Sequence, residues 1–171
     1  MSVAFRRESD EEHLEPKFER PIAPGPNLVT ARGLRLLGEK VAAIEAAVAA
    51  ETDEIERAVL KRELRYWHTR QTTAEIAPLP QDGTVGIGSR VTVRMNEAKR
   101  IVQIVGGDEA DPATGLIGFQ APLAQALIGG EVGERMEFNG VEDAIEIRSI
   151  AAGEDLHGRN FRPPPPALET G

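Results

Sequence analysis

A regular seam of apolar residues runs from residue 34 to residue 48. It consists of five side chains at spacings of 3, 4, 3 and 4 residues: Leu34, Leu37, Val41, Ile44 and Val48. This spacing places apolar side chains on one stripe of a helix that packs against a partner helix. Thr30, just before the seam, is a residue type that caps helix N-termini. The seam therefore predicts a helix that starts after Thr30 and needs a second helix to cover its stripe.

A second and less regular apolar seam follows in residues 55–77. It ends at Ala77, before Pro78 and Pro80, because the proline ring and the missing N–H stop a helix. Two helices with one apolar stripe each bury those stripes most simply as an antiparallel hairpin. One long helix stays open as an alternative, since no Gly or Pro interrupts residues 49–56. The phase of the seam slips there, which favours the hairpin.

Four carboxylates fill the stretch between the two seams. Glu51, Asp53, Glu54 and Glu56 lie within six residues that contain no basic side chain. Asp53 can cap the second helix with Glu56 three residues later, and acids in a first turn favour the helix dipole. Alternatively, the carboxylates stand exposed at the far end of an arm about 30 Å long, at 1.5 Å per residue. The two interpretations are compatible only in part, because a capping carboxylate turns toward its own backbone.

From Thr84 onward the apolar period changes to that of strands. In SRVTVRM, Val91, Val93 and Met95 alternate with polar residues, and AKRIVQIV, GLIGFQ, ERMEF and DAIEIRSI are further strand candidates. PLAQALIG predicts a short helix with Pro122 at its first position and Gly129 past its end. Together with the helical hairpin, a mostly antiparallel sheet of four or five strands and one helix predicts the α+β class.

Composition excludes several classes of function. A net charge of -8 gives no field that attracts nucleic acid, so any link to DNA or RNA should pass through a protein partner. The absence of cysteine excludes disulfides, thiolate catalysis and Cys-ligated zinc, and the three histidines lie far apart. The first residues have no signal-peptide core, and no segment approaches the roughly 20 apolar residues that span a bilayer. We expect a cytoplasmic protein without a membrane partner.

Proline and charge patterns mark the two ends of the chain as different from the middle. We expect a flexible arm before the hairpin, since charges and four prolines bury little apolar surface, and a disordered tail that carries the PPPP run. The predicted layout is a flexible N-terminal arm in 1–27, a hairpin in 28–78, a C-terminal domain in 79–152 and a proline-rich tail in 153–171.

The string RIVQIVGGDEADPATGLIGFQAPLAQALIGGEVGERMEF, Arg100 to Phe138, resembles the C-terminal domain of the GreA/GreB family of bacterial transcript cleavage and elongation factors. The family carries a similar run of IVG, an acidic DEAD, GLI, a helix led by Ser-Pro that ends in ALIG, and EVGD. NLVTARGLRLL and RYWHTRQTTAEI resemble the start of the family's first helix and the end of its second. The resemblance covers residues 27–150 and implies an antiparallel coiled-coil hairpin followed by an FKBP-like domain.

The resemblance also implies a function on bacterial RNA polymerase. The C-terminal domain would dock at the rim of the secondary channel, and the hairpin would enter that channel. For the GDEADP stretch, the other interpretation is a solvated turn, and for the PLAQALIG helix it is packing on the sheet. Ala121 stands where the family has Ser. The residues that match the docking region are Asp108, Glu109, Asp111, Gln120, Ala121 and Pro122.

For the acidic tip, the resemblance implies a part in RNA cleavage. The family's tip GDLKENAEY has an Asp and a Glu three residues apart, and Asp53 and Glu56 match that separation, with Glu51 and Glu54 beside them. These acids would help hold a Mg²⁺ ion in the polymerase active site, where backtracked RNA is hydrolysed. The chain would then have no cofactor of its own and would not itself be an enzyme.

Three alternatives stand beside a cleavage factor. The arm is shorter than the family's, which favours a regulator that occupies the channel without cleavage or with weak cleavage; a relative of the nucleoside diphosphate kinase regulator is a nearby variant, but the seam here is longer than its hairpin needs. A structural adaptor is the second alternative. A peptidyl-prolyl isomerase is the third, but residues 84–150 offer only Phe119 and Phe138 as aromatic walls for a proline.

Overall fold

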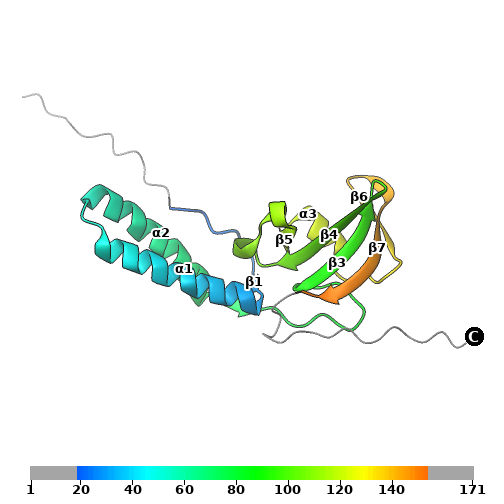
Figure 1. Ribbon diagram of the computed structural model, residues 1–171, viewed down its shortest axis with the longest axis horizontal. Helices are drawn as coiled ribbons and strands as arrows, with labels where there is room; N and C mark the ends of the chain where they lie inside the picture. Colours follow the sequence, from blue (N-terminus) through cyan, green and yellow to red (C-terminus); the bar gives the residue numbers. More distant parts are fainter. Residues whose placement is uncertain (1–18, 154–171) are drawn as a thin grey trace, which may run out of the picture.

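The computed structural model describes residues 19–153, which form a pair of helices followed by a sheet (Figure 1). Most of the predicted arm, residues 1–18, and the predicted tail from residue 154 lie outside the described residues. Within residues 19–153, no helix combines the length and the apolar character that crossing a membrane requires. Helices and a sheet in one chain confirm the α+β prediction.

Two helices of similar length form the first half of the described chain. Helix α1, Ala31–Ala50, and helix α2, Glu54–Thr72, are joined by residues 51–53 and lie side by side (Figure 1). Thr30 caps α1, with its Oγ1 accepting the Gly33 N–H at 3.0 Å. The chain therefore turns back at the acid cluster instead of continuing as one long helix. Coiled coil as a name for this pair stays a prediction.

The end of α2 differs from the prediction. The helix ends at Thr72, and Ala74–Ile76 forms strand β2, which pairs in parallel with strand β1, Asn27–Val29. Asn27 Nδ2 donates to the carbonyl oxygen of Arg70 at 2.7 Å, so it satisfies a carbonyl that the helix end leaves without an intrahelical donor. The predicted helix to Ala77 was wrong because strands of three residues are too short to show a period in the sequence.

The second half is a five-stranded sheet in the order β5-β4-β3-β7-β6. Its pairs are antiparallel except β4 with β5, which is parallel. The strands follow the predicted segments closely, and α3 begins at Pro122 as predicted. The bounds are β3 Ser89–Met95, β4 Ala98–Val105, β5 Leu116–Gly118, α3 Pro122–Leu127, β6 Arg135–Phe138 and β7 Val141–Ala152.

One face of this sheet is the core of the domain. Inward residues of β3, β4 and β7 pack with Ala124 and Leu127 of α3, all of them buried. Two short 3₁₀ turns connect β4 to β5: η1, Gly107–Glu109, and η2, Pro112–Thr114. Because η1 contacts both α1 and β1, it is the place where the sheet domain meets the base of the hairpin.

The segment before β1 is tied to both halves of the molecule. The Arg20 guanidinium carbon lies 4.2 Å from the centroid of the Tyr66 ring, and Glu19 forms an ion pair with Arg65 of α2. Further along, a Cβ added to Gly25 would lie 3.7 Å from Nε2 of Gln120. Residues 19–26 therefore follow the hairpin and reach the loop before α3.

Candidate functional site

At the tip of the hairpin, Asp53 is the N-cap of α2. Its Oδ1 accepts the N–H groups of Ile55 at 2.9 Å and Glu56 at 3.0 Å. These are backbone donors that the first turn of a helix leaves without intrahelical partners. Of the two interpretations of the acid cluster, the structure supports the helix start for Asp53.

Two of the other tip acids also have partners in the turn. Glu51 Oε1 accepts the N–H groups of Thr52 at 2.8 Å and Asp53 at 2.9 Å. Glu54 pairs with Arg57, whose Nε also donates to the carbonyl oxygen of Glu51. These contacts order the turn, so they reduce the freedom of both carboxylates to bind anything else.

Glu56 is the tip acid with a different environment. It is exposed, and within residues 19–153 its carboxylate makes no hydrogen bond or ion pair. No group of three or more His, Cys, Asp or Glu side chains in the described residues has an arrangement that holds a metal ion. A Mg²⁺ ion held by Asp53 and Glu56 therefore stays a prediction, and it requires further ligands from a partner.

The capping contact gives a first testable expectation. Asp53→Ala is expected to lower the free energy of unfolding by about 1 kcal/mol, because the N–H groups of the first turn lose their acceptor. Asp53→Ser keeps an acceptor at the cap and is the matched control, expected to stay close to wild type. Urea denaturation followed by circular dichroism at 222 nm measures both. Equal stability of the two variants would show that the cap contributes nothing.

At the base of the hairpin, Glu109 binds the start of α1. Its side chain is 2% exposed. Oε2 accepts the Thr30 hydroxyl at 2.7 Å, and Oε1 accepts an N–H of Arg32 at 2.7 Å. The Thr30 hydroxyl thus caps α1 and also donates to the sheet domain. A Cβ on Gly33 would lie 2.6 Å from Glu109 Oε2, so this close approach requires a glycine.

Asp108, the neighbouring residue, binds α2 instead. Its Oδ1 accepts the Tyr66 hydroxyl at 2.7 Å, and its Oδ2 pairs with Nε of Arg70. The side chains of Asp108 and Arg70 are 10% and 11% exposed. Burial, together with the hydrogen bond to Asp108, raises the pKa of Tyr66, so the phenol remains a donor at neutral pH.

These contacts define the junction, which consists of Asp108 and Glu109 on η1 with Thr30, Arg32, Tyr66 and Arg70 on the hairpin. The solvated-turn interpretation was wrong for Asp108 and Glu109, because both carboxylates turn inward and each holds one helix. Their direct binding to another protein stays a prediction, although their side chains already have partners within the chain. No spacing in the sequence signals the junction, since Arg32 and Glu109 lie 77 positions apart.

The remaining predicted docking residues lie at the surface around β5 and α3. Asp111 is exposed at the start of η2. Gln120 and Pro122 are exposed, and Ala121 is half-buried against the core at the N-cap of α3. Gln120 and Pro122 are thus accessible to a partner protein, with Ala121 between them. Asp108 and Glu109 differ from them because their carboxylates bind the hairpin.

Comparison with known proteins locates a family match in the sheet domain. The family model described as "Transcription elongation factor, GreA/GreB, C-term" matches residues 80–152. Transcription elongation factor GreA of Mesoplasma florum is 42% identical over 73 residues, which cover 40% of this chain and 47% of that protein. GreA of Nautilia profundicola is 36% identical over 104 residues, which cover 59% of this chain and 55% of that protein. The chain thus spans about half the length of these curated relatives.

Among solved structures, GreA factor homolog 1 (Gfh1) of Thermus thermophilus matches 75% of this chain and 100% of its own at 17% identity. Its TM-score of 0.36 is too low to support a conclusion about function or fold. The family match therefore rests on the sequence of residues 80–152, which contains strands β3 to β7, α3 and the two junction acids. Residues 80–152 of this chain are therefore similar to the C-terminal domain of GreA/GreB transcription elongation factors.

Proposed function

We propose that this protein is a transcription elongation regulator that binds bacterial RNA polymerase. The family match over residues 80–152 supports a polymerase-associated role. The structural observation that carries the proposal is the junction, in which adjacent carboxylates of η1 hold α1 and α2 separately. A factor that docks through one domain and inserts another into a channel needs the two in a fixed relation, and the junction supplies it.

In this proposal the FKBP-like C-terminal domain docks at the rim of the secondary channel. Gln120 and Pro122, exposed at the start of α3, and Asp111 on η2 are the contact residues, with Ala121 between the first two. The hairpin is a coiled-coil arm of about 30 Å, given 20 residues in α1 at 1.5 Å each. Nascent RNA or DNA is then reached only through the polymerase.

We further propose that the arm occupies the channel without efficient stimulation of RNA cleavage. One carboxylate oxygen of Asp53 caps α2. Glu51 accepts backbone N–H groups of the turn, and Glu54 forms an ion pair with Arg57. A carboxylate that binds its own backbone is a poor additional ligand for a Mg²⁺ ion, which demands near-ideal geometry. The protein is not an enzyme in either case, because hydrolysis would belong to the polymerase.

Cleavage stimulation is the second candidate, and Glu56 favours it. This carboxylate is exposed and unpaired within the described residues, at the far end of the arm. It is a hard oxygen ligand of the kind Mg²⁺ takes. One acid instead of two would give weaker cleavage than a tip with a complete pair.

The test uses a backtracked elongation complex assembled with the cognate polymerase. We expect the wild-type protein to bind the complex and to leave the rate of RNA shortening within about twofold of polymerase alone, since the tip lacks a free pair of acids. The decisive variant is Asp53→Ser with Glu56→Gln, which removes both carboxylates and keeps a cap. Glu75→Gln, at an exposed position at the hairpin base, is the control.

Each outcome of this experiment separates the candidates. If wild type and Glu75→Gln shorten the RNA and the tip variant does not, the tip acids stimulate cleavage by the polymerase and the second candidate holds. Failure of the wild-type protein to bind polymerase at all would contradict the proposed function. Because serine retains the cap, loss of cleavage in the tip variant would not reflect a disordered helix start.

A further inference from the structure

The face of the sheet opposite α3 carries a group of cations. On β3, the exposed Arg90 and Arg94 alternate with valines of the core. In the strand register, Arg94 lies opposite Lys99 of β4 on one side and Glu146 of β7 on the other. Directly opposite residues on one face have Cβ atoms about 5 Å apart, so Arg94 is a neighbour of both Lys99 and Glu146.

The row continues across the other half of the sheet. Arg135 of β6 lies opposite Glu146, and Arg148, two residues further along β7, lies beside the same carboxylate, with its Nη1 2.8 Å from Oε1. The hydrogen bond from Arg148, with the charges of Arg135 and Arg94 adding to it, holds the pKa of Glu146 below its usual value. Glu146 thus stands among three cations, Arg94, Arg135 and Arg148, which leaves positive charge for a ligand.

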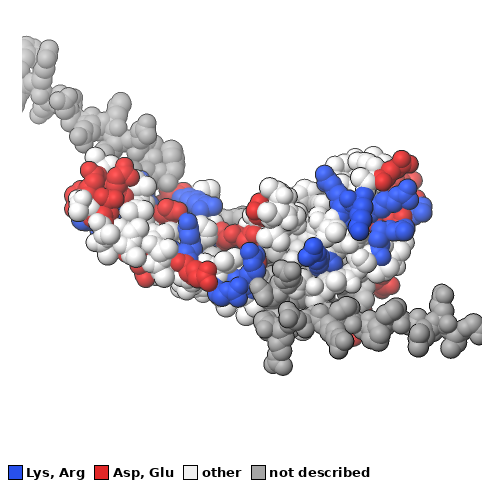
Figure 2. Space-filling view, viewed as in Figure 1, with Lys and Arg blue, Asp and Glu red and all other residues white. Residues whose placement is uncertain are grey.

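We call this surface the cationic face: Arg90, Arg94, Lys99, Arg135 and Arg148. Figure 2 shows Lys and Arg gathered over this end of the sheet domain, with Asp and Glu beside them, and a further group of Asp and Glu at the far end of the hairpin. In a chain with a net charge of -8, such a gathering of cations is a local feature that the total charge conceals. The sequence alone does not reveal this surface, because its cations are spread over four strands.

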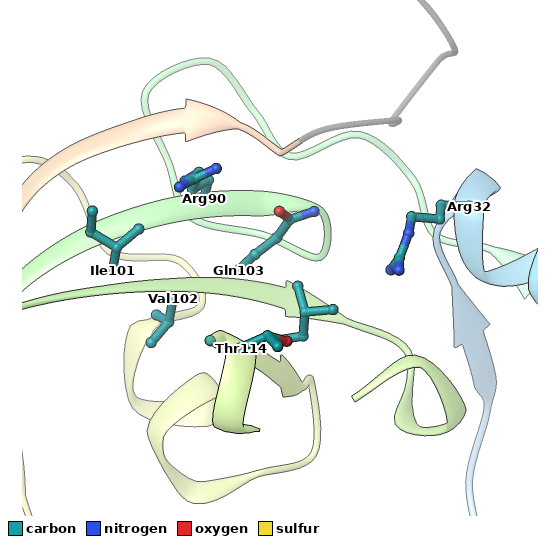
Figure 3. A pocket seen from close by; sticks show the side chains of 8 residues that line it. Arg32, Arg90, Ile101, Val102, Gln103 and Thr114 are labelled. Carbon is teal, nitrogen blue, oxygen red and sulfur yellow. The ribbon is translucent and has the colours of Figure 1, made fainter. Parts of the chain in front are cut away.

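A crevice extends the cationic face toward the hairpin. It has a volume of about 370 Å³ and is lined by Arg32, Arg90, Ile101, Gln103 and the loop 114–116, with Val102. Arg32 reaches into it from the hairpin side and Arg90 from the sheet (Figure 3). Arg90 and Arg94 are four residues apart on one strand, which separates them by about 13 Å. Cations are therefore spread along a path and not concentrated at one point.

We propose that the cationic face binds an acidic polypeptide segment of a partner protein. Guanidinium groups pair with carboxylates through two parallel hydrogen bonds. Ile101, 45% exposed beside the cations and lining the crevice, offers an apolar contact to a peptide side chain. This surface lies apart from the α3 start used in the proposed function, so the inference goes beyond that function.

The same features disfavour nucleic acid as the occupant. Single strands are held by aromatic side chains on which bases stack, and the outward residues of β3 and β4 include none.

The test measures binding of a fluorescein-labelled deca-glutamate peptide to the full chain by fluorescence anisotropy. We expect salt-sensitive binding by the wild type and at least a roughly tenfold weaker affinity for Arg94→Glu with Lys99→Glu, because two attractive contacts become repulsive. The matched control, Arg35→Glu with Lys61→Glu, makes the same change of charge on the hairpin. Its affinity should stay within about twofold of wild type, because only distant charges change.

A second probe decides between the two classes of partner. A ten-nucleotide single-stranded RNA is titrated in the same way. RNA binding that the Arg94→Glu, Lys99→Glu variant loses, without deca-glutamate binding, would overturn the proposal in favour of nucleic acid. Equal weakening in both double variants, or no binding of either probe, would also overturn it.

Folding of the variants is checked by circular dichroism. Should the glutamate variant not fold, Arg94→Gln with Lys99→Gln removes the charges without introducing repulsion, and a roughly threefold or greater loss of peptide affinity is then expected. Unchanged affinity in that variant would contradict the proposal. Neither probe contains polymerase, so the result leaves the proposed function to its own experiment.

Discussion

Replacing Glu109 by alanine is expected to lower the free energy of unfolding by about 3 kcal/mol, because removing one partner of a buried ion pair leaves the other uncompensated. The Glu109 side chain is 2% exposed and accepts from both Thr30 and Arg32. Alanine leaves the Thr30 hydroxyl and the Arg32 guanidinium without this acceptor. Arg32 is 32% exposed, so water can recover part of its hydration, which keeps the expected loss near the lower end for buried pairs.

Urea denaturation of the full chain measures this loss. Glu142→Ala is the matched control, since Glu142 is an exposed acid on β7. It is expected to change stability by less than about 0.5 kcal/mol, as surface substitutions usually do. Faster proteolysis between residues 77 and 83 in Glu109→Ala would show in addition that the hairpin is released from the sheet domain. If the two variants were equally stable, the junction would contribute no net stability.

Gly106→Ala is expected to have the second largest effect, a loss of about 2 kcal/mol, because inserting a methyl group into a packed contact forces backbone shifts. A Cβ on Gly106 would lie 2.8 Å from the carbonyl oxygen of Leu28 and 3.3 Å from Cα of Val29. Both are backbone atoms of β1, which pairs with the strand after α2. Neither can move without displacing the base of the hairpin.

Gly107→Ala is the control for this substitution, one residue further along. A Cβ there has nothing within 4 Å, so only the backbone entropy of the unfolded chain changes. We expect Gly107→Ala to be neutral or slightly stabilising. Thermal and urea denaturation of both variants measure the difference. An equal loss of stability in both variants would mean that the destabilisation arises from the backbone conformation and not from the close approach of β1.

The regular elements of this fold were predictable because their side chains repeat along the sequence. The seam with Leu37 and Val41 predicts α1, and the alternation around Val91 predicts β3. Strands β1 and β2 were missed because three residues show no period. At the tip, the residue types permitted a cap or a metal ligand, and only the backbone N–H groups near Asp53 favour the cap.

The candidate docking surface was harder to predict than the fold. The family resemblance assigns Asp108 and Gln120 to the same docking surface. In the structure, the Asp108 side chain points inward and Gln120 is exposed. The partners of Asp108, Tyr66 and Arg70, lie about 40 positions away, and ion pairs at such separations have no characteristic spacing. The cationic face was missed for a related reason, since its side chains become neighbours only through the register in which the strands pair.

Adjacent residues in η1 serve different helices, and this limits how the loop can change in length. Surface loops generally accept insertions, because little depends on the direction of any one side chain. Here one extra residue beside Asp108 or Glu109 would rotate a carboxylate away from its helix while the other stayed in place. The hairpin would then be held on one side only and would tilt. The loop between β4 and β5 is therefore a structural connection between the sheet domain and the hairpin, and its length is as constrained as that of a core strand.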